Sequence, residues 1–291
     1  MIKNLVLQGG GVKGIAYAGA IKVLEDKGIL KNLEKTAGVS AGAITATVIA
    51  LNYSASETYS LISGLDFTSF KDNKDIFRLL TTYGVYAGDS FLQWIKGVIK
   101  EKTGSETTTF AELKLQNFKD LHILATELNS HGIKIFNAQN TPDVIVAEAV
   151  RASMSIPLFF KAFSFSQGID PKNVYVDGGM VWNFPLEIFD TENTINTETL
   201  GLCLWDYDGQ TAHSPVSFNN LESYIKVLVN TLSYAQSVVV GRTIENDFRK
   251  IKIADFAIDP TDFTISEADK LRLYQSGIDY TTDFFKLIVT I

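Results

Sequence analysis

Apolar residues in the first fifty positions switch between short continuous runs and helical spacing. Residues 2–7 form a short apolar run, and residues 35–39 have the pattern of a second buried strand. Helical spacing follows each of them, over residues 15–24 and over residues 41 to about 51. This strand–helix–strand–helix order predicts a parallel sheet that is covered by helices on both faces.

The same alternation returns after a long, mainly helical stretch over residues 52–118. In that stretch Asp89 is placed to cap a helix over 91–100, and Thr109 with Glu112 has the spacing of a capping box. Further along, buried strands are predicted at 121–126, 133–137, 174–176 and 200–204.

The rest of the chain combines helical spacing with one more strand pattern. Pro142 is placed in the first turn of a helix that ends near Arg151. The remaining elements are predicted as a helix over about 221–246 and a strand over 250–258. Ser266 and Asp269 are placed to cap a last helix that ends at Leu287.

No internal repeat and no Pro-rich linker divides this pattern. We therefore expect a single domain over residues 1–291, with residues 52–118 as a mainly helical insertion. The expected fold is a three-layer α/β/α arrangement around a mainly parallel central sheet.

Composition narrows the class of protein. The 291 residues are 46% hydrophobic and 20% charged, which is ordinary for a globular protein with a sizeable core. The net charge of −7 argues against a nucleic-acid partner, because phosphate binding needs an excess of Lys and Arg. The single cysteine, Cys203, lies in an apolar run and has no partner for a disulfide within the chain. Without a signal-peptide pattern or an apolar run of about 20 residues, a soluble cytoplasmic protein is the expectation.

The sharpest local motif is Gly38-Val39-Ser40-Ala41-Gly42, a G-x-S-x-G between a predicted strand and a predicted helix. In such a turn the serine is held in a strained backbone geometry that exposes its hydroxyl. Gly38 and Gly42 let the strand and the helix pack closely. Taken alone, the motif also fits an ordinary glycine-rich turn.

A second glycine-rich turn, Gly9 to Gly14, follows the first strand and opens the first helix. Its backbone N–H groups could face an oxyanion or a phosphate. The turn also satisfies G-x-G-x-x-G, so a non-catalytic or nucleotide-binding module that uses this loop is the main alternative. A dinucleotide fold needs an acidic residue at the end of the second strand, where this chain has Ser40, while Glu34 precedes that strand.

The third candidate is Asp177, which begins an Asp-Gly-Gly turn after the strand predicted at 174–176. An aspartate at the carboxyl end of a strand faces the rim where α/β sheets bind ligands. A serine nucleophile needs a base, and Asp177 is placed to supply one.

With these residues in order, the chain resembles the patatin-like phospholipases. That family has a glycine-rich oxyanion loop, a G-x-S-x-G elbow and a distant Asp-Gly-Gly or Asp-Gly-Ala turn, matched here by Gly9–Gly14, Gly38–Gly42 and Asp177–Gly179. The block Ala152-Ser153-Met154-Ser155-Ile156-Pro157, and Asn183 with Pro185, also resemble family segments. Where this chain has Lys13 the family often has arginine, so the planar guanidinium group, with its several donors, is replaced by a single ammonium group.

The resemblance implies a patatin-like fold and a Ser40–Asp177 dyad, with Gly10, Gly11 and Lys13 at the oxyanion hole. It implies no metal and no organic cofactor. It implies that the substrates are acyl-ester lipids, such as those cleaved by phospholipase A-type enzymes or lysophospholipases, and that the protein reaches them by peripheral contact with a membrane. His213 keeps a Ser-Asp-His esterase open, because Ser40, Asp177 and His213 follow the chain order of an α/β-hydrolase triad. It stands in a polar segment that is also typical of a surface loop.

Overall fold

We describe the protein from a computed structural model. The described residues are 1–205, 220–221, 223–225, 227–228, 230–232, 235 and 248–289. Much of the helix predicted at 221–246 lies outside them, as does His213.

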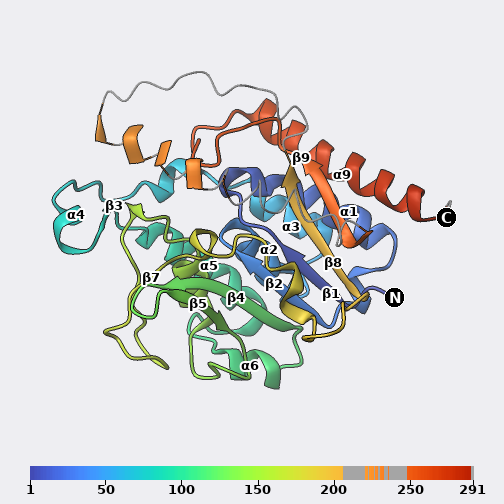
Figure 1. Cartoon of the computed structure of the whole chain (residues 1–291), viewed down its shortest axis with the longest axis horizontal. Coiled ribbons are helices and arrows are strands. Elements are labelled where there is room, and N and C mark those ends of the chain that lie inside the picture. The colour runs from blue at the N-terminus through green and yellow to red at the C-terminus, as the bar shows by residue number, and fades with distance from the viewer. Residues whose placement is uncertain are drawn as a thin grey trace.

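A mainly parallel sheet forms the centre of the protein (Figure 1). Its strand order is β5-β4-β2-β1-β8-β9, with β7 pairing with β4 beyond this path. Strands β4, β2, β1, β8 and β9 run parallel, whereas β5 and β7 run antiparallel to β4. The strands are β1 (Asn4–Leu7), β2 (Lys35–Val39), β4 (Asp120–Glu127), β5 (Gly132–Phe136), β7 (Tyr175–Asp177), β8 (Thr199–Trp205) and β9 (Lys250–Ala254). The predicted α/β class is confirmed, and each strand predicted for this sheet is present.

The α-helices are α1 (Ile15–Asp26), α2 (Ala41–Ala50), α3 (Ala55–Ser63), α4 (Arg78–Thr81), α5 (Asp89–Thr103), α6 (Phe110–Leu115), α7 (Val146–Ser153) and α9 (Glu267–Val289). Short 3₁₀ helices are η1 (Gly11–Gly14), η2 (Leu30–Asn32), η3 (Phe67–Phe70), η4 (Gly178–Met180) and η5 (Leu186–Phe189). The stretch predicted as helical also holds β3 (Gly84–Tyr86), which pairs with β6 (Leu158–Phe160) in a separate two-stranded sheet that the sequence did not reveal. None of the described helices is both long enough and apolar enough to cross a membrane.

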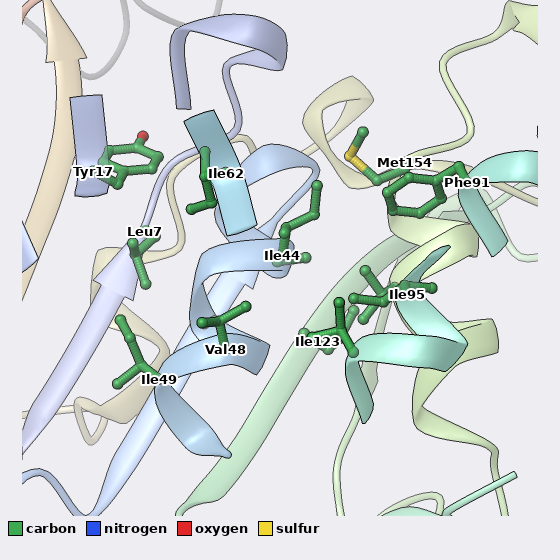
Figure 2. Close-up of a cluster of buried hydrophobic side chains, with 14 of the residues drawn as sticks. Leu7, Tyr17, Ile44, Val48, Ile49, Ile62, Phe91, Ile95, Ile123 and Met154 are labelled. Carbon is green, nitrogen blue, oxygen red and sulfur yellow. The ribbon is translucent and has the colours of Figure 1, made fainter. Parts of the chain in front are cut away.

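The two faces of the central sheet carry cores of different size. Alternate residues of a strand point to opposite faces, so Leu5 and Leu7 of β1 join the large core while Val6 joins the small one. The large core lies under helices that include α1, α2 and α5 (Figure 2). The small core is Val6, Ala37 and Cys203 packed against Phe184 and Leu186, next to η5. Cys203 is fully buried in β8, as its apolar run predicted.

Several predicted ends of elements are confirmed and three are wrong. The Thr109–Glu112 capping box is present, and the Ser266 hydroxyl accepts a hydrogen bond from the N–H of Asp269. Asp89 is the first residue of α5 and does not cap it. The carboxylate of Asp72, far away in sequence, accepts the N–H groups of Gly88 and Ser90 and caps the helix in its place.

The other two corrections arise from neighbouring segments. The helix expected from Pro142 begins at Val146, because Ile145 forms a β-bridge with Thr109 and is held extended. The strand expected over 250–258 ends at Ala254, because the carboxylate of Asp255 accepts the N–H of Ala257 and turns the chain.

Helices α1 and α9 pack backbone to backbone across two glycines. A Cβ atom on Gly277 would lie 1.9 Å from the carbonyl oxygen of Ala16, and one on Gly19 would lie 2.0 Å from that of Tyr274. Figure 1 shows the two helices side by side. This approach leaves no room for a side chain at either position.

Gly277→Ala should therefore lower the free energy of unfolding by about 1–3 kcal/mol, because the helices must separate to admit a methyl group. Gly97→Ala is the matched control, since a Cβ atom there meets nothing within 4 Å. It should raise that free energy by about 0.4–1 kcal/mol through reduced entropy of the unfolded chain. Urea unfolding followed by circular dichroism measures both, and equal midpoints for the two variants would contradict this packing.

Candidate active site

Ser40 occupies a strained turn between β2 and α2. Its φ of 52° and ψ of −124° lie outside the regions that residues with a side chain prefer, which costs about 1–3 kcal/mol. Two hydrogen bonds hold the turn: the Ser40 N–H donates to Ser153 Oγ at 2.8 Å, and the Ser153 hydroxyl donates to the carbonyl oxygen of Leu124 at 2.6 Å. The elbow is thereby fixed to strand β4.

The two motif glycines allow the close approach that the elbow needs. A Cβ atom on Gly38 would lie 2.2 Å from the carbonyl oxygen of Gly42, at the start of α2. One on Gly42 would lie 2.4 Å from the carbonyl oxygen of Leu7, in the neighbouring strand β1. Each contact is with backbone, so neither can be relieved by rotating a side chain. Both glycines support the turn from behind and do not line the pocket at Ser40.

The glycine-rich loop after β1 faces the same pocket. Gly10, Gly11 and Lys13 line it together with Ser40 and Asp177. The N–H of Gly9 donates to the carbonyl oxygen of Asn183 at 3.0 Å, whereas the N–H groups of Gly10 and Gly11 make no hydrogen bond within the described residues. Two backbone donors beside a serine hydroxyl are suited to stabilising an oxyanion.

Asp177 reaches Ser40 because β7 follows β2 along one edge of β4. Strand β2 pairs with β4 up to Val39 opposite Leu124, and β7 begins pairing on that side with Asp177 opposite Ala125. On its other side β4 is occupied by β5. The strand that carries Asp177 is therefore antiparallel to its neighbour, and its carboxyl end meets the carboxyl end of β2 head-on.

Burial controls the electrostatics of Asp177. The residue is 6% exposed, and loss of solvent raises the pKa of its carboxyl group to about 6. The N–H of Gly179 donates to the carboxylate at 2.8 Å, and this bond together with the nearby Ser40 hydroxyl offsets part of that rise in pKa. The carboxyl group can therefore exchange a proton near neutral pH, in the pocket that it lines together with Ser40.

The segment Ser153–Pro157 contacts both of these residues. Ser153 holds the Ser40 backbone, Met154 Sδ lies 3.5 Å from Ser40 Oγ, and the carbonyl oxygen of Ser155 accepts the N–H of Asp177 at 2.9 Å. The sequence analysis assigned none of these three to the site. The Ala152–Pro157 block, noted only for its resemblance to a family segment, was the signal that could have identified them.

A second, almost wholly apolar pocket adjoins the first. Gly11 and Ile156 line both pockets, and Met154, in contact with Ser40, lines the apolar one. Its remaining walls include five aromatic side chains: Phe67, Phe70, Phe91, Phe160 and Phe263. Phe159, Phe160 and Phe165 belong to the core, and of these three only Phe160 also lines this pocket.

The described histidines lie away from Ser40. His122 contacts Asp120, Asn137 and the ring of Phe189, and His131 sits in the turn between β4 and β5. Neither lines the pocket with Ser40 and Asp177. Within the described residues, no three side chains of His, Cys, Asp or Glu are grouped as a metal site.

Sequence comparison gives this geometry its context. A sequence model described as patatin-like phospholipase matches residues 5–190. The chain belongs to that family. It is 32% identical to an uncharacterised protein of Acanthamoeba polyphaga mimivirus, over 95% of this chain and 91% of that protein. It is 30% identical to YqhO of Bacillus subtilis, over 97% of both. A probable lipid hydrolase of Invertebrate iridescent virus 6 is 26% identical over 64% of this chain and 62% of its own.

Solved structures show the same patatin-like fold. VipD from Legionella pneumophila superposes with a TM-score of 0.66 at 19% identity, over 98% of this chain and 67% of that one. ExoU of Pseudomonas aeruginosa, in complex with SpcU, gives a TM-score of 0.53 at 18% identity and covers all of this chain, which spans about half of the longer one (52%).

The raised pKa of Asp177 predicts the pH dependence of this patatin-like site. Only the ionised carboxylate can accept the Ser40 proton, so reaction of Ser40 with a fluorophosphonate should be constant well above pH 6 and fall about tenfold per unit below it. The rate constant of labelling, measured by mass spectrometry between pH 4.5 and 8.5, checks this. A break near pH 4, the ordinary value for aspartate, would contradict the effect of burial.

Proposed function

We propose that the protein is a lipid acyl hydrolase of the phospholipase A or lysophospholipase type, with Ser40 as nucleophile and Asp177 as base. The observation that carries the proposal is that Ser40 and the buried carboxyl group of Asp177, whose pKa is about 6, line one pocket at the adjoining ends of β2 and β7. Family membership and the related probable lipid hydrolase support acyl-ester lipids as substrates.

The reaction proceeds by acyl transfer in two steps. Asp177 accepts the Ser40 proton while the serine oxygen attacks the ester carbonyl, and the leaving alcohol then takes that proton. Water attacks the acyl-enzyme with Asp177 again as base, which releases the fatty acid and restores Ser40. The N–H groups of Gly10 and Gly11 hold the oxyanion in both steps, and each such donor typically contributes about 3 kcal/mol, or a hundredfold in rate.

The two pockets suit an acyl ester. The polar one holds Ser40 and the free backbone donors, where the ester carbonyl would bind. The apolar one begins beside Met154 and offers aromatic walls to an acyl chain. The net charge of −7 gives no general attraction to anionic lipids, so peripheral contact with a membrane would depend on apolar groups.

Two observations weigh against a nucleotide-binding module. Glu34, the acidic residue at the right separation, lies before β2 and its carboxylate is 3.7 Å from the ammonium of Lys3. The carboxyl end of β2, where a dinucleotide fold holds its ribose, leads instead into Ser40. The glycine loop therefore adjoins a nucleophile and lacks the acidic partner.

Ser40→Ala tests the nucleophile. The variant should lose fluorophosphonate labelling and ester hydrolysis together, because no other hydroxyl replaces the attacking atom. Labelling is read by intact mass, and hydrolysis by fatty acid released from a short-chain lysophospholipid. Ser223→Ala serves as the control, since that serine is only partly buried and lies outside the pocket. Full activity in Ser40→Ala would end the hydrolase assignment.

Asp177→Asn and His213→Ala separate a dyad from a triad. Asparagine keeps the shape of aspartate but cannot act as a base, so Asp177→Asn should lower kcat at least a thousandfold while circular dichroism stays unchanged. His213→Ala should retain most of the activity, because a dyad needs no imidazole. If His213→Ala is folded and as inactive as Ser40→Ala, the triad replaces the dyad.

A further inference from the structure

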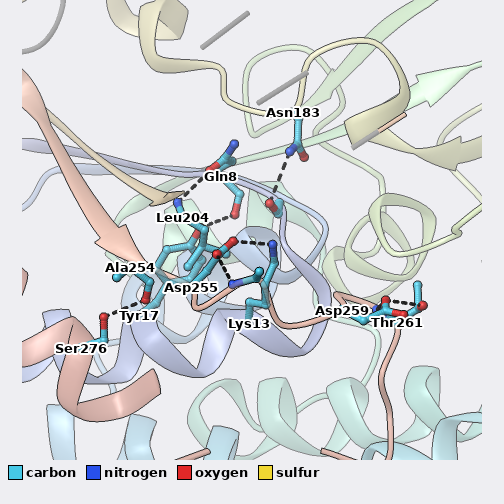
Figure 3. Close-up of polar contacts among 12 residues, drawn as sticks. Gln8, Lys13, Tyr17, Asn183, Leu204, Ala254, Asp255, Asp259, Thr261 and Ser276 are labelled. Atoms are coloured by element: carbon cyan, nitrogen blue, oxygen red, sulfur yellow. Dashed lines mark hydrogen bonds and ion pairs between the residues drawn. The ribbon is translucent and has the colours of Figure 1, made fainter. Parts of the chain in front are cut away.

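The oxyanion loop is held on its outer side by a segment from the far end of the chain. Residues 255–261 follow β9 and run beside the loop (Figure 3). The N–H of Val12 donates to the carbonyl oxygen of Pro260 at 3.0 Å, and Lys13 Nζ lies 2.6 Å from Asp255 Oδ2. Pro260 and Thr261 also line the pocket that contains Ser40.

Contact at Gly11 is tight enough to fix the backbone. Gly11 has a φ of 56°, and a Cβ atom there would lie 1.9 Å from the carbonyl oxygen of Pro260. That oxygen also accepts the Val12 N–H, so the loop would clash with Pro260 if it moved closer and would lose this hydrogen bond if it moved away. The neighbouring N–H groups of Gly10 and Gly11 are the proposed oxyanion donors.

Asp255 is itself held rigidly. Its N–H donates to the carbonyl oxygen of Trp205 at 3.1 Å, and its Oδ1 accepts the N–H of Ala257 at 3.1 Å. The side chains of Lys13 and Asp255 are 17% and 6% exposed, so little water competes for their ion pair. A charge-assisted contact between two such groups fixes geometry more firmly than a surface pair does.

We propose that Asp255 is a positioning residue, which holds the Gly10 and Gly11 N–H groups in place through Lys13. This inference rests on the proposed acyl hydrolase function. Residues 255–261 lie outside the part of the chain matched by the family, residues 5–190. The oxyanion hole is therefore completed by the carboxyl-terminal part of the chain, and Lys13 acts as an anchor whose charge Asp255 neutralises.

An alternative role for Lys13 makes the opposite prediction. If its ammonium group stabilised the oxyanion directly, removal of Asp255 would free that charge and leave the rate unchanged or higher. If Lys13 is an anchor, removal of either partner releases the loop and lowers the rate. Asp255→Asn therefore distinguishes the two roles.

The chain supplies a matched control at the other end of the same strand. Arg249 precedes β9 and pairs with Asp190 at 2.5 Å, with side chains 2% and 11% exposed. Asp255 follows the carboxyl end of β9 and pairs with Lys13, which lines the pocket that contains Ser40. Asp190→Asn breaks an equally buried ion pair and should reduce thermal stability, yet leave kcat within twofold of the wild type.

The experiment measures kcat and KM on a short-chain lysophospholipid, with a thermal melt for each variant. Asp255→Asn and Lys13→Met should each lower kcat at least tenfold with KM within about twofold, because the donors act on the transition state. The double variant should fall little below either single one, since the pair acts as a unit. Lys13→Arg should recover most of the rate lost in Lys13→Met, because a guanidinium also reaches Asp255.

Several outcomes would overturn the assignment. They are an Asp255→Asn variant with wild-type kcat or higher, a Lys13→Met variant with wild-type kcat, and an Asp190→Asn variant that loses as much kcat as Asp255→Asn. If Asp255→Asn does not fold, Lys13→Gln decides, because its amide N–H can still donate to Asp255 but carries no charge. A kcat as low as that of Lys13→Met would then overturn the anchor role. An inactive wild type would refute the proposed function and this inference with it, whereas an active wild type with an equally active Asp255→Asn would refute this inference only.

Discussion

The rest of the site depends on the backbone of Ser40, held at a φ of 52°. Such a conformation persists only where its surroundings over-determine it. Here the Ser153 hydroxyl accepts from the elbow and donates to Leu124, while Gly42 packs on the backbone of β1. Strain at one residue is thus balanced by contacts with two neighbouring strands. The result is a serine hydroxyl presented at the carboxyl end of the sheet.

The pairing along β4 gives that hydroxyl its partner. Because β7 takes up the edge of β4 where β2 ends, Asp177 points back at the elbow from an antiparallel strand. Ser40 and Asp177 are both buried where these strands meet. The carboxyl group of Asp177 is therefore desolvated, and its pKa rises to about 6. The same strand pairing therefore places Asp177 beside the elbow and, by burying it, raises the pKa of its carboxyl group.

Residues distant in sequence complete the pocket. The family match covers residues 5–190, which include the elbow, the glycine loop and Asp177. Leu204, Pro260 and Thr261 line the same pocket from beyond that match. The mimivirus and Bacillus subtilis relatives match nearly the whole length of this chain. Their sequences can therefore be compared with it at the carboxyl-terminal residues that contact the glycine loop.

Much of the fold could be predicted from the sequence, because it depends on interactions between residues close together in the chain. Three predicted features depend only on neighbours within a few residues, and the structure contains all of them. They are the glycine spacing around Ser40, the Thr109–Glu112 capping box and the apolar runs of the central strands. Three other features depend on residues that only folding brings together. They are the direction of β7, the cap that Asp72 provides for α5, and the Lys13–Asp255 pair. The raised pKa of Asp177 could not be predicted from the sequence either. Desolvation depends on every residue packed around the carboxyl group, and a short sequence motif does not specify those residues.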